Sequence, residues 1–131
     1  MKKFGLLLFV TVVLAACSNQ PIYNVDNRPI PTTVQQYPLE RIETLIIEAG
    51  QARGWRFTRQ APGHLVASQV QPKYSATVDI YFDQRNYRIA YRSSVGFREK
   101  DGTIHQHYNF WIRNLQSDID TRLANASIMQ N

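Results

Sequence analysis

The side chains with the greatest potential for chemistry are three histidines, at positions 64, 105 and 107. Histidine is a common metal ligand and a common general base. His105 and His107 stand two positions apart in a segment whose pattern predicts a helix. Helix positions two apart point about 200° from each other, whereas ligand pairs on a helix need i, i+3 or i+4 spacing. We therefore expect no metal site and no cofactor.

A hydrolytic triad is the second chemistry to consider, since Ser93, His105 and either Asp79 or Asp101 supply its ingredients. A nucleophilic serine usually sits in a motif such as Gly-x-Ser-x-Gly beside an oxyanion hole. This chain has no such motif and no recognisable oxyanion loop. We expect a structural His105, in the first helical turn, with a hydrogen bond toward Ser93 or Ser94. A small hydrolase or enzyme-inhibiting module that uses His105 and Ser93 remains the alternative.

Arginines are the candidates for binding rather than catalysis. Arg88 and Arg92 alternate with apolar positions in a predicted strand, so both are expected on its polar face. Tyr81 falls on the polar face of the preceding predicted strand, and Arg56 joins them if the pairing allows. The planar guanidinium group suits carboxylates and phosphates. This face is expected either to dock acidic groups or to be simply solvated.

The elements that must position these residues begin with a helix. Pro38 suits its first turn, apolar residues follow at helical spacing as far as Ala52, and Arg53-Gly54 suits its end. Four strands are then predicted at 55–59, 65–70, 75–82 and 87–95, separated by turns. Their alternation indicates a sheet covered on one face only. We predict an α+β two-layer domain, helix, four-stranded antiparallel meander, helix, with both helices on one sheet face.

The last helix carries the strongest periodic signal. Thr103-Ile104-His105-Gln106 has the spacing of a capping box at its start. Apolar residues then recur along one arc: Ile104, Tyr108, Trp111, Ile112, Leu115, Ile119, Leu123 and Ala126. Asn109, at the edge of this arc, is expected to tie the helix to a loop backbone. Phe110 projects from the opposite side, where it is expected to be exposed, or to be covered by the N-terminal segment or by a partner.

The N-terminal segment predicts the location of the protein. Lys2 and Lys3 precede an apolar stretch that ends at Leu14, too short for a membrane span of roughly 20 residues. The sequence Leu14-Ala15-Ala16-Cys17 follows, and Cys17 is the only cysteine. This motif resembles the lipobox of bacterial lipoproteins. In that family a diacylglycerol is attached to the cysteine sulfur, and a peptidase then cuts the chain before it.

The lipobox resemblance implies a signal peptide over residues 1–16 and a lipid anchor on Cys17, with enough acyl chains for stable membrane attachment. Position 18, directly after the cysteine, is serine and not the aspartate that tends to retain lipoproteins of this family at the inner membrane. The resemblance thus implies the periplasmic face of the outer membrane, with the inner membrane as the alternative. Residues 17–36 are polar and rich in proline, so we expect a flexible spacer there. A globular domain is expected over residues 37–131.

Composition limits the partners. Removal of Lys2 and Lys3 leaves 13 basic residues against 10 acidic ones, a formal net charge of +3. With one cysteine, the chain has neither a disulfide framework nor a cysteine metal site. The mature charge is compatible with lipid headgroups, glycan polymers or an acidic protein, whereas nucleic acid is not expected in the periplasm.

A second resemblance covers most of residues 39–123. It rests on the segments Tyr91-Arg92-Ser93-Ser94 and Ile104-His105-Gln106-His107-Tyr108-Asn109-Phe110-Trp111-Ile112-Arg113-Asn114-Leu115. These resemble the pattern Tyr-x-x-Ser, then Ile-His-x-x-Tyr-Asn-x-Trp-Ile-x-x-Leu, of small uncharacterised lipoproteins of Gram-negative bacteria, whose first helix ends near Gly-Trp, here Gly54-Trp55. Val95-Gly96-Phe97 departs from the Asn-Leu pair that is common between the two blocks. The resemblance implies fold and location, but no activity.

We therefore expect a non-enzymatic, lipid-anchored protein of the cell envelope that binds an envelope protein or polymer. The candidate contact residues are Arg88, Arg92, Tyr81 and Phe110. A purely structural spacer lipoprotein, with no defined partner, is a further alternative.

Overall fold

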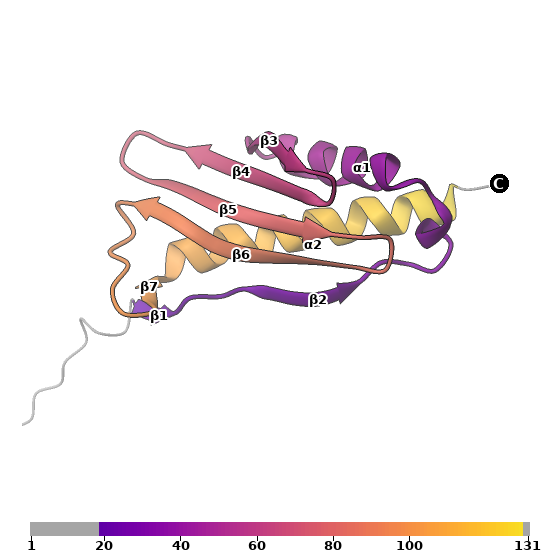
Figure 1. The fold of residues 1–131 in the computed structure, drawn as a ribbon. Coiled ribbons are helices and arrows are strands. Elements are labelled where there is room, and N and C mark those ends of the chain that lie inside the picture. Colours follow the sequence, from indigo (N-terminus) through magenta and orange to yellow (C-terminus); the bar gives the residue numbers. More distant parts are fainter. Residues whose placement is uncertain (1–18, 130–131) are drawn as a thin grey trace, which may run out of the picture.

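The computed structural model describes residues 19–129, which fold into a layer of strands and a layer of two helices (Figure 1). The elements follow in the order β1 (Asn19–Pro21), β2 (Val25–Pro29), η2 (Val34–Gln36), α1 (Leu39–Gln51), β3 (Arg56–Ala61), β4 (His64–Val70), β5 (Ser75–Phe82), β6 (Asn86–Val95), β7 (Thr103–His105) and α2 (Gln106–Ile128). No helix of residues 19–129 is both long and apolar enough to cross a membrane. The predicted α+β class is confirmed.

The main sheet has five antiparallel strands in the order β2-β6-β5-β4-β3, and β1 pairs with β7 in a separate two-stranded sheet. The predicted meander corresponds to β3, β4, β5 and β6, with strand ends within two residues of those expected. The prediction of four strands is nevertheless wrong, because β2 adds a fifth strand beside β6. This strand comes from the segment that was expected to be a spacer.

Alternation along the strands creates the core, as the sequence predicts. Val78, Ile80 and Phe82 of β5 are buried, whereas the residues between them are half-exposed. Both helices lie along the buried side of the sheet (Figure 1). Pro38 stands at the start of α1 as expected, and Gly54 follows the end of that helix with a φ of 95° that suits glycine. The core-facing residues of α2 are Tyr108, Asn109, Ile112, Leu115, Ile119 and Leu123.

The start of α2 differs from the prediction. Thr103 is not a helix cap; it belongs to β7, where it pairs with Pro21, and the helix begins only at Gln106. The Thr103–Gln106 spacing suits a capping box, but pairing with the N-terminal segment keeps residues 103–105 extended. The local sequence around Thr103 could not reveal this pairing with a segment far away in the chain. Trp111 is also less buried than expected and packs edge-on against the fully buried Trp55, with 6.3 Å between ring centroids.

The expectation of a flexible spacer over 17–36 is wrong from residue 19 onward. Residues 19–37, here called the N-terminal strap, run along α2 and the outer edge of β6 (Figure 1). Val25, Ile30 and Val34 are buried in the core. The burial of each side chain contributes roughly 1.5–3 kcal/mol to the stability of the fold. Ile22, Val25, Ile30 and Val34 are spaced by three, five and four positions, which matches neither the strand nor the helix period. For that reason the segment resembled a linker.

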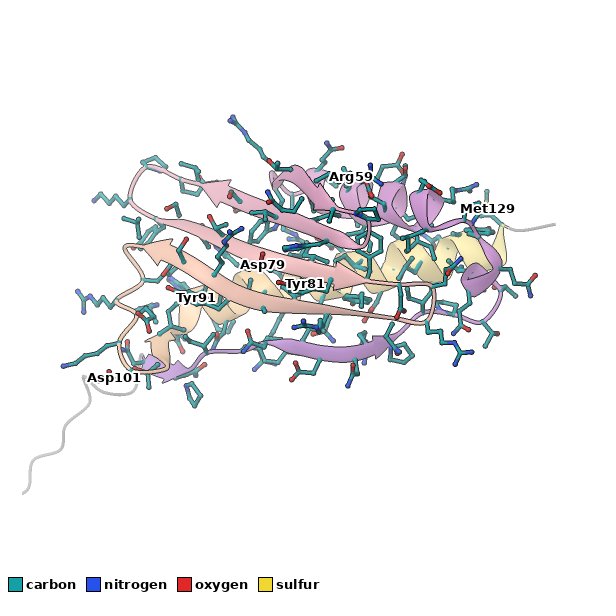
Figure 2. All side chains as sticks on the ribbon, viewed as in Figure 1. Arg59, Asp79, Tyr81, Tyr91, Asp101 and Met129 are labelled. Atoms are coloured by element: carbon teal, nitrogen blue, oxygen red, sulfur yellow. The ribbon has the colours of Figure 1, made fainter. Side chains whose placement is uncertain are left out.

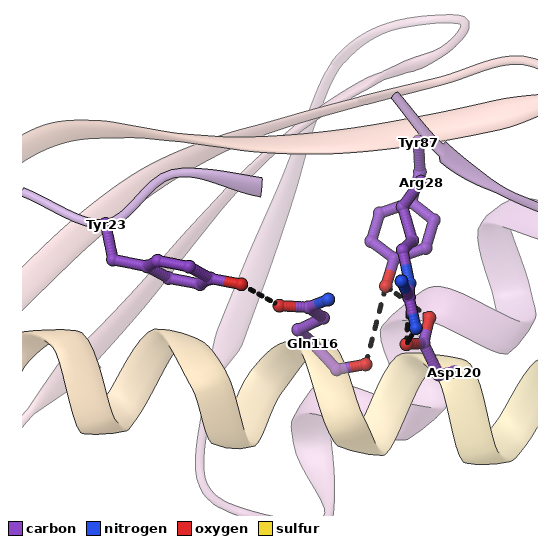
Figure 3. Close-up of polar contacts among 5 residues, drawn as sticks. All are labelled: Tyr23, Arg28, Tyr87, Gln116 and Asp120. Carbon is purple, nitrogen blue, oxygen red and sulfur yellow. Dashed lines mark hydrogen bonds and ion pairs between the residues drawn. The ribbon is translucent and has the colours of Figure 1, made fainter. Parts of the chain in front are cut away.

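Polar contacts fasten the strap to α2 along its length. The buried Asn109 accepts a hydrogen bond from the Tyr23 amide at 2.9 Å and donates one to the Pro21 carbonyl at 2.9 Å. The expectation that Asn109 ties the helix to a loop backbone is thereby confirmed, with the strap as the loop. Farther along, the Tyr23 hydroxyl donates to Gln116, as Figure 3 shows.

Asp120 joins three elements at one carboxylate (Figure 3). It accepts a hydrogen bond from the Tyr87 hydroxyl of β6 at 2.6 Å and pairs with Arg28 of β2 at 2.8 Å. Burial raises the pKa of the Tyr87 hydroxyl, and the Asp120 hydrogen bond raises it further. Tyr87 therefore stays protonated and remains a donor to Asp120.

Asn109→Ala is expected to lower the free energy of unfolding by roughly 2–4 kcal/mol, because two backbone groups of the strap lose their partner. Chemical denaturation measures this change. Amide exchange in residues 20–25 should accelerate by more than the global loss accounts for. Asn114→Ala is the matched control, an exposed position on the same helix that should change stability by less than about 0.5 kcal/mol. Equal losses of stability in the two variants would contradict the role of Asn109 in holding the strap against α2.

Candidate functional site

The face of the sheet turned away from the helices, here called the open sheet face, carries four cross-strand rows, of which the fourth contains Val70, Ser75 and Val95. The first row places Tyr81 of β5 directly between His64 of β4 and Arg88 of β6. The second row contains Val66, Asp79 and Ala90, and the third contains Arg56, Ser68, Thr77 and Ser93. Figure 2 shows Asp79 and Tyr81 near the centre of the sheet. Side chains in adjacent rows and strands are close enough to interact.

The first row forms a stack of three flat groups. The His64 ring lies parallel to the Tyr81 ring, with 4.3 Å between centroids and 19° between planes. On the other side, the guanidinium carbon of Arg88 lies 4.1 Å from the centre of the same ring. Because β4 and β6 flank β5, the two neighbours cover opposite faces of Tyr81. Cation–π attraction of this kind favours the position of the Arg88 guanidinium over the ring.

Asp79 links this stack to the next row. His64 Nε2 lies 2.7 Å from Asp79 Oδ1, which is hydrogen-bonding distance. Arg92 Nη1 approaches the same oxygen at 3.5 Å, a long contact at an exposed position. A register shift between Thr77 and Val78 makes Arg92 the additional residue of a β-bulge. The bulge directs Arg92 toward the open sheet face and places Ser93 opposite Thr77.

A hollow of about 330 Å³ adjoins the Arg88 end of the first row. Its walls are the β3–β4 turn, the β5–β6 turn and Asn27, with Tyr81 and Arg88 at its edge. Asp83 also lines it, but its carboxylate already accepts hydrogen bonds from the backbone amides of Arg85 and Asn86. Among the described residues 19–129, no carboxylate lies within ion-pairing distance of Arg88. A free guanidinium therefore borders a hollow large enough for a small anionic group.

The structure brings together three of the predicted contact residues, Arg88, Arg92 and Tyr81, on the open sheet face. The fourth, Phe110, does not join them, because it projects from α2 in the other layer. It is 49% exposed, as expected, and its nearest aromatic neighbour is His107, with 6.0 Å between centroids. Cys17 lies outside the described residues.

Sequence reasoning did not place His64 and Asp79 in this array. Asp79 shares the polar face of its strand with Tyr81, which the alternation shows, but the contact with His64 depends on register. The turn between β4 and β5 sets that register, since Gln71 and Tyr74 exchange backbone hydrogen bonds there and Val70 pairs with Ser75. The turn residues Gln71-Pro72-Lys73 between the two strands were the available signal.

His105 and Ser93 do not meet as the hydrolase alternative requires. Ser93 faces the open side of the sheet, whereas His105 caps α2, where its Nδ1 accepts a hydrogen bond from the His107 amide at 3.1 Å. The expected hydrogen bond from His105 to Ser93 or Ser94 is not formed. Tyr91 contacts Ser94 instead, with 2.9 Å between the two hydroxyl oxygens.

The two neighbouring histidines also differ from the expectation of opposed side chains. Because His105 precedes the helix, its ring lies 4.8 Å from that of His107. Within residues 19–129, no three side chains of the metal-binding types gather into a possible ion site. Burial lowers the pKa of His105, and the nearby His107 and Arg98 lower it further.

Comparison of the chain with known protein families, with curated proteins and with solved structures finds no match. The interpretation of the open sheet face therefore rests on its own geometry.

Protonation of His105 is expected to destabilise the domain, because only an unprotonated Nδ1 can accept from the His107 amide. The folded pKa lies below the ordinary histidine value of about 6.5. The unfolded chain thus takes up the proton first, and this contribution to stability is lost as the pH falls through the ordinary value toward the folded one. Thermal unfolding at about pH 7.5 and about pH 5 measures the drop.

His105→Asn keeps a capping acceptor that does not titrate, so its drop in stability between the two pH values should be smaller than that of the wild type. His105→Ala removes the cap as well, and should cost roughly 0.5–2 kcal/mol at neutral pH. An unchanged pH dependence in both variants would assign the effect to other groups.

Proposed function

We propose that this chain is a non-enzymatic, lipid-anchored binding or adaptor protein of the bacterial cell envelope, placed at the periplasmic face of the outer membrane. Its ligand carries a carboxylate or phosphate and belongs to an envelope protein or polymer. The observation that carries the proposal is the stack of Arg88, Tyr81 and His64 on a sheet face that no helix covers.

The stack favours recognition of an anion over stacking of a sugar ring. Both faces of Tyr81 are already occupied, so the ring cannot offer a flat apolar platform to a ligand. What remains available is the edge of the array, where Arg88 presents N–H donors beside the hollow. A guanidinium held in one orientation loses little freedom on binding, which favours a paired contact with two oxygens of a carboxylate or phosphate.

Some charges on this face are paired with one another, whereas others have no acidic partner. Asp79 engages His64 and approaches Arg92, so that part of the array is internally neutralised. Arg88 at one end, and Arg56 in the third row, have no acidic partner among residues 19–129. The net excess of positive charge is therefore at the borders of the open sheet face. Binding through such exposed charges should weaken as salt increases.

Membrane attachment rests on the lipobox at Leu14-Ala15-Ala16-Cys17 and on the apolar segment before it. A non-enzymatic role is supported by the separation of Ser93 from His105, the two residues that the hydrolase alternative requires together.

Photo-crosslinking in cells tests the binding surface. A photoreactive residue at Asn86, which lines the hollow, is expected to form a discrete adduct, whereas the same probe at Gln51 on α1 should not. Mass spectrometry of the adduct identifies the ligand as protein, glycan or lipid. Adding Arg88→Gln should reduce the adduct at least severalfold, because the free guanidinium is lost.

Arg59→Gln is the matched control for Arg88→Gln. Arg59 is an exposed arginine of β3 that pairs with Glu43 of α1 at 3.2 Å, so its replacement leaves the open sheet face unchanged. The adduct should persist in this variant. An adduct that survives Arg88→Gln undiminished would refute the proposed binding site.

Cys17→Ala tests the anchor. The wild type should mature to a chain that begins at residue 17 and carries an acyl mass, and it should partition into the detergent phase. Cys17→Ala should lose both properties, because no other thiol is present to accept the lipid. Ser18→Ala is the control and should retain them. Detergent partitioning of Cys17→Ala equal to that of the wild type would contradict lipidation at Cys17.

A further inference from the structure

Exposed apolar side chains gather at one end of the molecule. Of the six large hydrophobic residues that are exposed within residues 19–129, four lie near β1, β7 and the start of α2: Val70, Tyr74, Val95 and Phe110. This end, here called the β1 end, also contains the β4–β5 turn and the loop from β6 to β7 (Figure 1). Val70 and Val95 are 71% and 67% exposed. Soluble surfaces usually scatter such residues singly, so their collection at one end requires an explanation.

The β1 end is a rigid platform rather than a set of free loops. Tyr74 of the β4–β5 turn packs against the buried Phe97 of the loop from β6 to β7, with 5.1 Å between ring centroids. Val70 and Val95 both pair with Ser75, so they share one cross-strand row. A Cβ at Gly96 would lie only 2.2 Å from the Lys73 carbonyl oxygen, which shows how closely the two loops approach. The apolar groups are thus held in fixed positions.

The folded strap places this platform next to the lipid attachment point. Cys17 stands two positions before Asn19, which pairs with His105 at the β1 end. Two residues reach at most about 7 Å. A flexible spacer over residues 17–36 would instead have allowed an average separation of about 25 Å. With the shorter reach, a lipid on Cys17 would hold the β1 end at the surface of the bilayer.

The charges at the β1 end are mixed. Lys73, Arg98 and Lys100 are basic, whereas Glu99 and Asp101 are acidic, and all five are exposed. Their formal sum is +1. Asp101 marks this end in Figure 2, opposite Met129. The net charge tolerates anionic headgroups, but contact with a membrane here would depend mainly on the apolar and aromatic side chains, which favour the interface between headgroups and acyl chains.

We propose that the β1 end rests on the phospholipid bilayer that holds the Cys17 lipid, with Val70, Tyr74, Val95 and Phe110 in contact with the headgroup region. This inference rests on the proposed lipidation of Cys17. The strands run from the β1 end to the opposite end, where the β3–β4 and β5–β6 turns line the hollow beside Arg88. Seating on the β1 end thus turns the hollow away from the membrane, toward a ligand in the periplasm.

Fluorescence quenching by labelled lipids tests the orientation. The full chain is purified with its lipid and reconstituted into vesicles of phosphatidylethanolamine and phosphatidylglycerol. With the Cys17 sulfur occupied by lipid, a cysteine introduced by Val95→Cys or Gln60→Cys is the only free thiol for a fluorophore. Position 60 is the matched control, since it is exposed at the end of β3 far from the β1 end. Lipids that carry a nitroxide near the headgroup should quench the label at position 95 severalfold more than the label at position 60.

A second pair of variants tests the apolar contact itself. Phe110→Asp should reduce the quenching at position 95 toward that at position 60, whereas Ile128→Asp, at the opposite end of α2, should not. Equal quenching at positions 95 and 60, in protein that floats with the vesicles, would overturn the seating and leave the anchor intact. Protein that does not float at all would overturn the anchor and, with it, this inference.

Discussion

The packing of the N-terminal strap against α2 is the contact on which the rest of the structure depends. It completes the sheet with β2, buries Val25, Ile30 and Val34, and keeps residues 103–105 extended as the partner of β1. Asn109 and Asp120 make this contact specific, because Asn109 bonds to the strap backbone and Asp120 pairs with Arg28 of the strap while also accepting from Tyr87 of β6. Without the strap, the outer edge of β6 would expose a row of unpaired backbone groups, which natural sheets avoid.

The same contact determines how far the domain can move from its proposed anchor. A strap that folds from residue 19 converts an expected tether into a short, stiff attachment. The position of the β1 end relative to a bilayer then follows from chain length, and the orientation of the whole domain follows from the direction of its strands. The proposed lipid anchor, combined with the folded strap, would therefore present one end of the protein to the membrane and the other to the periplasm.

The open sheet face owes its organisation to register rather than to any single residue. The β4–β5 turn at residues 71–74 sets His64 opposite Tyr81, and the β5–β6 turn sets Tyr81 opposite Arg88. The bulge at Arg92 then brings a second guanidinium toward Asp79. Each contact is modest, since all lie at a solvated surface, but together they link Arg88, through Tyr81 and His64, to Asp79. Preorganisation of this kind is what a binding surface needs, because it lowers the entropy lost when the ligand arrives.

Short-range patterns in the sequence determined most of the elements. Alternation defined β3, β4, β5 and β6 and their buried faces, helical spacing defined α1 and α2, and the same alternation placed Arg88 and Tyr81 on the uncovered face. Tertiary structure alone determined the conformation of residues 19–36. Their apolar side chains have no local period, and they are buried only when α2 and β6 are present to pack against them. Tertiary structure also decided that Thr103 pairs with Pro21 instead of capping a helix, and that His64 and Asp79 join the arginines. Such choices depend on contacts between residues far apart in the chain, and those contacts leave no periodic trace in the sequence.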